Sequence, residues 1–216
     1  MRLKPVETPG ISGCFNKMNI LATNDDGIQC EGILRLIEMF RGQGHHVLAV
    51  VPDRNRSGAS HSITFGASLS LARIDDNTYT YGGSPVDCVL VALTPGGLSY
   101  RPDMIISGIN AGPNLGTDIL YSGTAAAARQ GSLYDIPSIA FSVYGAAPYC
   151  FEEAARWSAV HLEELSGLWR LDTFINVNYP NTSRLSDYVV TYPLPRIYED
   201  IIYMEENADG SKICCM

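Results

Sequence analysis

The chain has 216 residues and a formal net charge of −8, from 15 Lys+Arg against 23 Asp+Glu, and 46% of its residues are hydrophobic. This length and composition fit one globular domain and exclude a disordered, collagen-like or coiled-coil chain. The acidic balance argues against duplex nucleic acid as the main ligand, because DNA binding rests on a basic surface. No lysine lies between residues 18 and 211, which excludes a P-loop or a Schiff-base lysine there.

The sequence carries no sign of export or membrane insertion. No apolar run reaches the length of a membrane span, and residues 1–17 lack the apolar centre of a secretory signal. The six cysteines form no C-x-x-C pair, which favours reduced thiols over a zinc site or a disulfide framework. We therefore expect a cytoplasmic protein that does not associate with membranes.

The predicted body of the chain opens with a βαβ unit. Residues 18–23 form an apolar run, residues 24–27 have turn chemistry, and apolar residues then recur at helical spacing up to Phe40. A second buried strand follows at 46–51. This unit predicts a parallel sheet with a right-handed crossover.

Strands and helices continue to alternate along the rest of the body. The expected elements are an antiparallel hairpin within 62–83, a helix at 85–93, a strand at 103–107, a glycine-rich loop at 108–118, a helix at 122–131, a strand at 137–142, a helix at 151–168 and a strand at 174–178. This order predicts the α/β class, with a Rossmann-like, doubly wound, mostly parallel sheet, an edge β-hairpin and a C-terminal extension. We expect residues 18–196 to form the domain, 1–17 an N-terminal arm, and 197–216 an acidic C-terminal extension.

Polar loops follow the predicted strands at the edge where open parallel sheets bind ligands. The first contains Asp25 and Asp26, whose adjacent carboxylates repel each other and need a positive partner when buried. Further oxygen donors in the next two loops are the hydroxyls of Ser57 and Ser60 and the amides of Asn110 and Asn114. Two carboxylates with a hydroxyl and an amide oxygen suit Mg²⁺, Mn²⁺ or Ca²⁺ better than zinc. Ordinary turns formed by Asp, Asn and Gly are the alternative interpretation.

A fourth polar loop, Ser122-Gly123-Thr124, opens a helix. Hydroxyls and free N–H groups at a helix start form an anion site, and phosphate is its natural occupant. An ordinary N-cap by Ser122 or Thr124 is the alternative. Of the four histidines, His61 follows the serine loop and is a candidate general acid or base, whereas the other three are expected to be structural or exposed.

Taken in chain order, these segments resemble the SurE (survival protein E) nucleotidases, a family of metal-dependent phosphatases that act on nucleoside monophosphates. The matching segments are NDDGI at 24–28, PDRNRSG at 52–58, HSIT at 61–64, GSPVDCV at 83–89, SGINAGPNLG at 107–116 and YSGT at 121–124. The resemblance covers residues 18–180 and implies that residues 18–196 are a SurE-like catalytic domain. Residues 1–17 precede the usual family start near Met18, and family chains normally continue beyond residue 216.

The resemblance also implies roles for individual residues. It assigns one divalent ion per subunit, Mg²⁺ or Mn²⁺, to Asp25, Asp26, Ser57 and Asn110. It assigns the substrate phosphate to Asn114, Ser122, Gly123 and Thr124. The expected catalytic residues are Asp25 and Asp26, with His61 added because of its position after the serine loop and not from the resemblance. The expected assembly is a homodimer or homotetramer.

The expected function is therefore that of a divalent-metal-dependent phosphomonoesterase that hydrolyses nucleoside 5′-monophosphates to nucleoside and phosphate. Some family members also act on 3′-nucleotides or short polyphosphate. A non-catalytic nucleotide- or phosphate-binding module is the alternative. Haloacid-dehalogenase phosphatases and receiver domains fit less well because they need a lysine that this body lacks, and a dinucleotide-binding oxidoreductase needs a G-x-G-x-x-G motif after the first strand.

Overall fold

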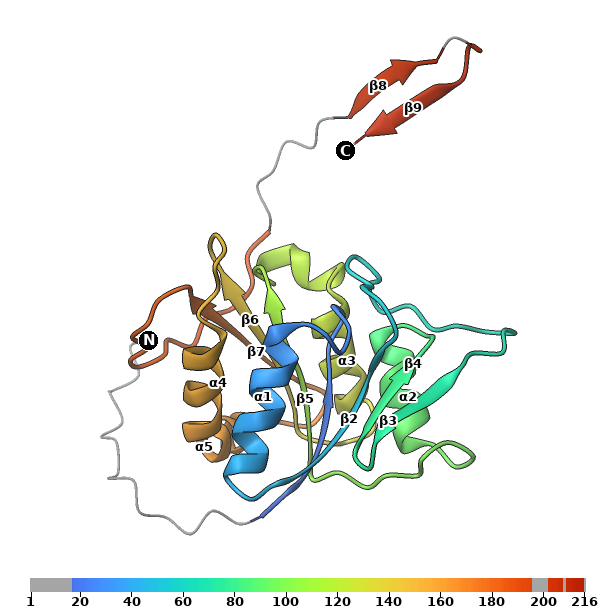
Figure 1. Cartoon of the computed structure of the whole chain (residues 1–216). Coiled ribbons are helices and arrows are strands. Elements are labelled where there is room, and N and C mark those ends of the chain that lie inside the picture. The colour runs from blue at the N-terminus through green and yellow to red at the C-terminus, as the bar shows by residue number, and fades with distance from the viewer. Residues whose placement is uncertain (1–16, 196–201, 208, 216) are drawn as a thin grey trace.

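The computed structural model describes residues 17–195, 202–207 and 209–215. Within these residues, a seven-stranded sheet forms the centre of the fold, in the order β3-β4-β2-β1-β5-β6-β7 (Figure 1). Neighbouring strands are parallel except for β3 and β4, which form an antiparallel hairpin at one edge. The strands are β1 (Asn19–Thr23), β2 (His46–Pro52), β3 (Leu71–Asp75), β4 (Thr78–Tyr81), β5 (Met104–Ala111), β6 (Ser138–Tyr144) and β7 (Ile175–Pro180). The predicted α/β class, with a mostly parallel sheet and an edge hairpin, is confirmed.

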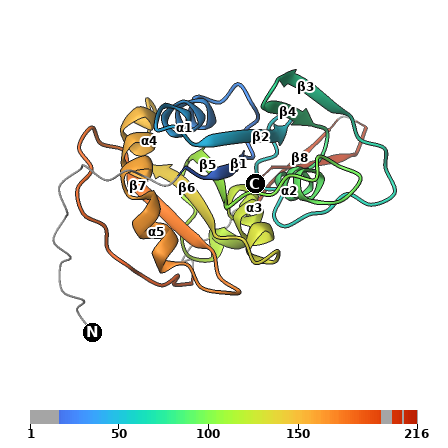
Figure 2. The ribbon, with the colours of Figure 1, turned by 90° about the horizontal axis from the view of Figure 1, so that it is seen from below.

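Helices cover both faces of this sheet. They are α1 (Glu31–Gly42), α2 (Pro85–Leu93), the 3₁₀ helix η1 (Gly116–Leu120), α3 (Gly123–Ser132), α4 (Phe151–Val160) and α5 (Leu162–Leu168). Figure 2 shows α1 and α4 on one face and α2 and α3 on the other. A core cluster fills each interface, one containing Phe40 and Phe141 and the other Val89 and Ala127. Each large buried apolar side chain contributes about 1.5–3 kcal/mol, so these clusters stabilise the sheet independently of its polar carboxyl edge.

The first turn of α1 is held against the end of β5. A Cβ on Gly32 would lie 2.0 Å from the carbonyl oxygen of Ile109, so only glycine allows this approach. The apolar residues Ile33, Leu36, Ile37 and Phe40 then bury one side of the helix. The start of α1 is thereby fixed, and with it the loop that leads from β1.

Helix α2 begins with a capping box. The Ser84 hydroxyl accepts a hydrogen bond from the Asp87 N–H, and the Asp87 carboxylate accepts one from the Ser84 N–H. Pro85 occupies the first turn, where a missing N–H costs nothing. The predicted helix at 85–93 is confirmed with the same bounds.

Two predicted elements differ from the structure. Strand β5 continues through part of the predicted glycine-rich loop, as far as Ala111. Its pairing with β6 is irregular between Ser107 and Asn110, where Gly108 has a φ of +124°. A bulge of this kind allows the strand to resume after the glycine. The predicted helix at 151–168 divides at His161. The Nδ1 of His161 bonds to the Trp157 carbonyl, and the His161 ring stacks on the Trp157 ring. At β5 the strand extends into a segment predicted as a loop, whereas at His161 a segment predicted as one helix is divided into two.

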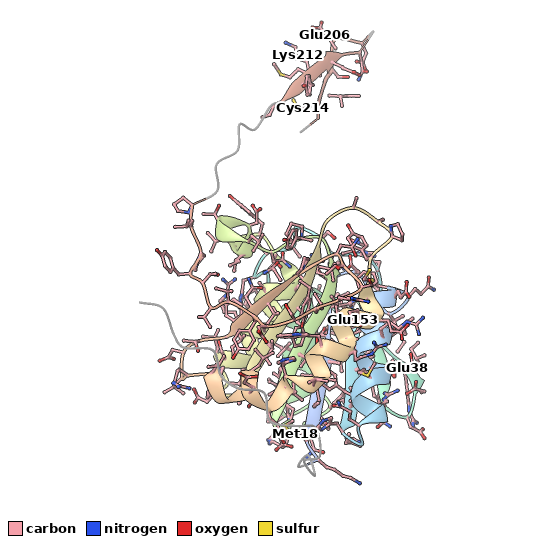
Figure 3. The ribbon with its side chains drawn as sticks, turned by 90° about the vertical axis from the view of Figure 1, so that its left-hand side faces the viewer. Met18, Glu38, Glu153, Glu206, Lys212 and Cys214 are labelled. Atoms are coloured by element: carbon pink, nitrogen blue, oxygen red, sulfur yellow. The ribbon has the colours of Figure 1, made fainter. Side chains whose placement is uncertain are left out.

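The described part of the C-terminal extension forms a second, two-stranded sheet. Strands β8 (Tyr203–Glu206) and β9 (Lys212–Cys215) pair antiparallel, with Glu206 opposite Lys212. Figures 1 and 3 show this hairpin standing apart from the main sheet. Residues 1–16 of the predicted arm and 197–201 of the predicted extension lie outside the described residues, so the domain boundaries stay predictions.

Candidate active site

The loops after β1, β2 and β5 meet the start of α3 at the point where the winding of the sheet reverses. From β1 the chain continues to β2 on one side, whereas β5 and the later strands lie on the other side. Doubly wound folds bind ligands in the crevice outside the carboxyl ends of such strands. These ends face the top of Figure 1, where η1 also lies.

Asp25 connects the end of β1 to the first turn of α3. The residue is 4% exposed, and its Oδ1 accepts a hydrogen bond of 2.5 Å from the Thr124 hydroxyl. A Cβ on Gly123 would lie 2.9 Å from the Cβ of Asp25, so the helix start comes this close only because residue 123 is glycine. Ser122 caps the helix, with its Oγ accepting from the Ala125 N–H at 3.0 Å. Asp25 and the start of α3 are therefore one packed unit.

Asp26 is half-buried and has two side-chain partners. Its Oδ1 accepts from the Asn55 amide at 3.1 Å, and its Oδ2 accepts from the Cys30 thiol at 3.7 Å. The turn that carries both aspartates is closed by Asn24, whose side chain bonds to the N–H and the carbonyl of Gly27. Gly27 has a φ of +90°, a conformation that favours glycine. The turn thus holds the two carboxylates in fixed directions.

The loop after β2 is bound to the aspartate turn through its backbone. The Arg56 N–H donates to the Asp25 carbonyl at 2.7 Å, and the Arg56 guanidinium bonds to the Gly82 carbonyl and to Asp53. Ser57 follows directly, is exposed, and its N–H donates to the Asn55 side chain at 2.8 Å. The structure therefore brings Ser57 beside the aspartate pair.

Asn110 reaches the same place from β5. Thr23, the last residue of β1, pairs with Ser107, and β5 continues past this pair to Ala111, so Asn110 lies beyond the end of β1, where Asp26 follows. The backbone of Ala111 also bonds to Asp26. The Asn110 amide nitrogen donates to the Gly112 carbonyl at 2.8 Å, which leaves its Oδ1 as the group able to bind a cation.

In the described part of the chain, no cationic side chain pairs with the two carboxylates. Burial raises the pKa of Asp25, against the Thr124 hydrogen bond, and the charge of Asp26 raises it further. Burial also raises the pKa of Asp26, against hydrogen bonds from Cys30, the Ala111 backbone and Asn55. Within the described ranges, neither carboxylate forms an ion pair with Lys, Arg or His. The site therefore favours a cation from solution.

The donors around this pair suit a hard divalent ion. In the part of the chain that the structure describes, no three His, Cys, Asp or Glu side chains converge on one point, so carboxylates alone do not form the site. Ser57 and Asn110, on the neighbouring segments, carry hydroxyl and amide oxygens of the kind that Mg²⁺ or Mn²⁺ prefers. The residues present thus fit the predicted ion.

The predicted phosphate residues fall into two groups. Ser122, Gly123 and Thr124 lie beside Asp25, although the Thr124 hydroxyl is already donated to that carboxylate. Asn114 is buried, and its bonded partners belong to β6 and β7: its side chain donates to Ser142 Oγ at 2.7 Å. The structure therefore joins the start of α3 directly to Asp25. It joins Asn114 to β6 and β7 instead.

His61, in the loop after β2, contacts α3 at a point further along that helix. Arg129 Nε donates to His61 Nδ1 at 2.9 Å, so the ring proton resides on Nε2, which donates to Gln130 Oε1 at 2.8 Å. Burial lowers the pKa of His61, against the Gln130 hydrogen bond, and the charge of Arg129 lowers it further. Arg129 follows Gly123 by six residues, or about 9 Å of helix. The structure does not bring His61 to the aspartate pair, and both of its ring nitrogens are occupied.

Sequence reasoning missed several residues that support the site. Asn55 bonds to Asp26, and Asn176 and Asn178 bond to the backbone of Asn114. Asn176 and Asn178 occupy alternate positions of a strand, where asparagine is disfavoured. That pattern was a signal available in the sequence.

The fold and the site define a doubly wound α/β protein with an acidic ligand site beside a helix N-terminus. A search against family models shows the particular group: the model for survival protein SurE matches residues 20–200, so the chain belongs to the SurE family. The resemblance seen in the motifs is confirmed. Within the described residues, no helix has the length and apolar character needed to cross a membrane.

Individual relatives agree with this assignment. The chain is 44% identical to the 5′-nucleotidase SurE of Stenotrophomonas maltophilia (strain R551-3) and 43% identical to that of Xanthomonas campestris pv. campestris (strain B100), each over 167 residues. These alignments cover 76% of this chain, which spans 64% of the length of either relative. The crystal structure of the SurE protein from Aquifex aeolicus is similar with a TM-score of 0.80 and 36% identity, covering 91% of this chain and 81% of that one.

Proposed function

We propose that this protein is a divalent-metal-dependent phosphomonoesterase that hydrolyses nucleoside 5′-monophosphates to nucleoside and phosphate. The observation that carries the proposal is the buried Asp25, packed on the first turn of α3 beside Asp26, with neither carboxylate paired to a cation in the described residues. The name 5′-nucleotidase, carried by relatives that are 41–44% identical, supports the same activity.

The proposed cofactor is one Mg²⁺ or Mn²⁺ per subunit, held by Asp25, Asp26, Ser57 and Asn110. When bound, such an ion supplies positive charge to the phosphate oxygens and acidifies water. Asp25 already accepts from Thr124, so we assign it the task of joining the ion site to α3. Asp26 is the more exposed carboxylate, and we assign it the proton of the attacking water.

The proposed phosphate subsite is the start of α3. The Ser122 Oγ accepts from Ala125, which leaves the hydroxyl hydrogen of Ser122 to donate to phosphate. The N–H of Gly123 and the positive end of the helix add to this attraction. For His61 we propose an anchoring role, because Arg129 and Gln130 occupy both nitrogens of its ring.

The finer predictions from the sequence and from the resemblance stay predictions. They are the homodimer or homotetramer, the cytoplasmic location, and activity on 3′-nucleotides or short polyphosphate. Light scattering of the full chain measures the assembly. The substrate panel below, with a short polyphosphate added, measures the substrate range.

The test is phosphate release from nucleoside 5′- and 3′-monophosphates with Mg²⁺ or Mn²⁺, repeated with EDTA and with Asp26→Asn. We expect EDTA to abolish turnover and Asp26→Asn to lower kcat at least about a hundredfold, since a proton acceptor contributes on that scale. Asp76→Asn, at an exposed residue of the edge hairpin, is the matched control and is expected to keep full activity. Turnover that survives EDTA, or an unaffected Asp26→Asn, would contradict the proposal. Nucleotide binding without turnover would support the binding-module alternative.

A further inference from the structure

Three polar residues form one row across the carboxyl ends of β5, β6 and β7. Asn110 pairs with Ser142, and Ser142 pairs with Asn178, in the parallel register of the sheet. Residues paired in this way project from the same face. Their apolar strand neighbours, such as Phe141 and Tyr179, belong to the core on the α1 and α4 face, so the row lies on the α3 face.

Asn114 is fixed on this row by four hydrogen bonds. Its N–H donates to Asn178 Oδ1 at 2.9 Å, and its carbonyl accepts from the side-chain nitrogens of Asn178 at 3.1 Å and Asn176 at 2.8 Å. Its own side-chain nitrogen donates to Ser142 Oγ at 2.7 Å. That nitrogen carries two hydrogens, so one remains for another acceptor.

The contact between Asn178 and Asn114 requires an asparagine. One short planar side chain both accepts from the N–H and donates to the carbonyl of the same residue. Aspartate has the same shape but no donor, and its charge would face the Asn114 carbonyl. Since asparagine is a poor strand former, β-propensity does not explain Asn176 and Asn178 in β7.

Asn114 stands between the two parts of the proposed site. It follows Asn110 by four residues, and η1 then leads to Ser122 at the start of α3. The chain of backbone bonds continues from Leu115 to Asp118 and from Asp118 to Ser122. The position of Asn114 therefore sets where its free amide hydrogen points and where η1 begins.

We propose that Asn178, assisted by Asn176, is a positioning residue for phosphate-monoester binding. It holds Asn114 so that the remaining amide hydrogen of Asn114 meets a phosphate oxygen, and it touches Asn114 rather than the substrate. The identity of the ligand rests on the proposed function. Asn178 makes two bonds to Asn114 and Asn176 makes one, so Asn178 has the larger effect.

Asn181, the residue that directly follows β7, provides a matched control. Its Oδ1 accepts from the Cys150 N–H at 2.7 Å, and its nitrogen donates to the carbonyls of Ala146 and Pro148. This is the same kind of clamp from side chain to backbone, but it holds the loop after β6. Asn181→Ala removes at least as many hydrogen bonds as Asn178→Ala without touching the loop of Asn114.

The experiment uses the full chain with Mn²⁺ and compares Asn178→Ala, Asn178→Asp, Asn176→Ala and Asn181→Ala. We expect both Asn178 variants to raise the KM for a nucleoside 5′-monophosphate and the inhibition constant of inorganic phosphate about tenfold, and Asn176→Ala about threefold. The kcat should change less than the KM. Asn181→Ala should lower the melting temperature at least as much as Asn178→Ala while leaving both constants near the wild-type values.

Equal shifts in Asn178→Ala and Asn181→Ala, or unchanged constants in both Asn178 variants, would overturn the inference. A wild-type chain that does not hydrolyse nucleotides would instead remove the proposed function, and calorimetric binding of inorganic phosphate with Mn²⁺ then decides this inference alone. Weaker binding in Asn178→Asp, but not in Asn181→Ala, supports it. Equal binding in the two variants, or no binding by the wild type, overturns it.

Discussion

Asp25 and Asp87 are both buried aspartates, 4% and 5% exposed; Asp87 lies in the first turn of α2, and Asp25 packs on the first turn of α3. The Asp87 carboxylate accepts three hydrogen bonds from the protein: two from the N–H and the hydroxyl of Thr64, and one from the N–H of Ser84. Asp25 accepts from the side chain and the backbone of Thr124 and from its own backbone, and it has a second carboxylate beside it. Burial alone therefore does not mark a functional carboxylate. The difference lies in what compensates its charge, which is the protein at Asp87 and, in the function proposed above, a cation from solution at Asp25.

Asp25→Asn should have the largest effect on activity. We expect kcat/KM to fall about a thousandfold, because the variant loses one ligand of the proposed divalent ion and one of the two negative charges that would neutralise that ion. The melting temperature of the metal-free protein should rise or stay constant, since a buried charge is removed. Enzyme assays and thermal unfolding of the same preparation check both parts, and a variant that unfolds at lower temperature would contradict the account of Asp25.

Asp87→Ala should show the opposite pattern. It removes the acceptor of three hydrogen bonds and one half of the capping box, so we expect a loss of about 3 kcal/mol in the free energy of unfolding. The folded fraction should keep its affinity for Mn²⁺. Chemical denaturation measures the first effect, and loss of Mn²⁺ affinity in the folded variant would show that the two aspartates are not functionally distinct.

The pH dependence of the metal-free protein follows from the raised pKa of Asp25 and Asp26. A carboxyl group whose pKa is higher in the folded state binds more protons there, so the free energy of unfolding falls as pH rises from the ordinary value of 3.8 through the folded value. Saturating Mg²⁺ should reverse this trend, adding about 2.7 kcal/mol at a hundred times its Kd. Melting curves across the acidic to neutral range, with and without Mg²⁺, test this, and a metal effect of equal size at all pH values would argue against carboxylate ligands.

His61→Gln should give the smallest change. A catalytic acid or base contributes about a hundredfold or more, whereas the loss of an anchoring contact costs about 1 kcal/mol of stability. We expect kcat to stay within about threefold of wild type. The lowered pKa of His61 means that the stability it contributes is present above its unfolded value and is lost as pH falls through its folded value. A pH–rate profile decides the point, because loss of a titrating limb in the variant would restore His61 as a catalytic residue.

The sequence was sufficient for the parts of the fold that follow local patterns. The helix at 85–93 carries its own start signals, Ser84, Pro85 and Asp87, and the structure has the same bounds. The alternation of strands and helices likewise determined the parallel sheet. Such features depend on neighbours along the chain, and their physical causes are visible in the residues themselves.

The contacts that make the site depend on residues far apart in the chain. Thr124 bonds to Asp25 across 99 positions, and the close approach of Asp25 requires glycine at position 123. His61 follows a polar loop in the sequence, yet its partners lie on the third turn of α3. Asn178 was predicted only as part of a strand. Side-chain direction and long-range pairing decide these cases, and a single sequence contains neither.

The most direct test of the account is a Mn²⁺ titration of the full chain, with free Mn²⁺ followed by electron paramagnetic resonance. The wild-type protein and Asp87→Asn should each bind one ion per chain, and Asp25→Asn should lose that binding. Equal binding by the wild type and Asp25→Asn, or loss of binding in folded Asp87→Asn, would contradict the claim that Asp25 and Asp26 form a divalent-cation site at the start of α3.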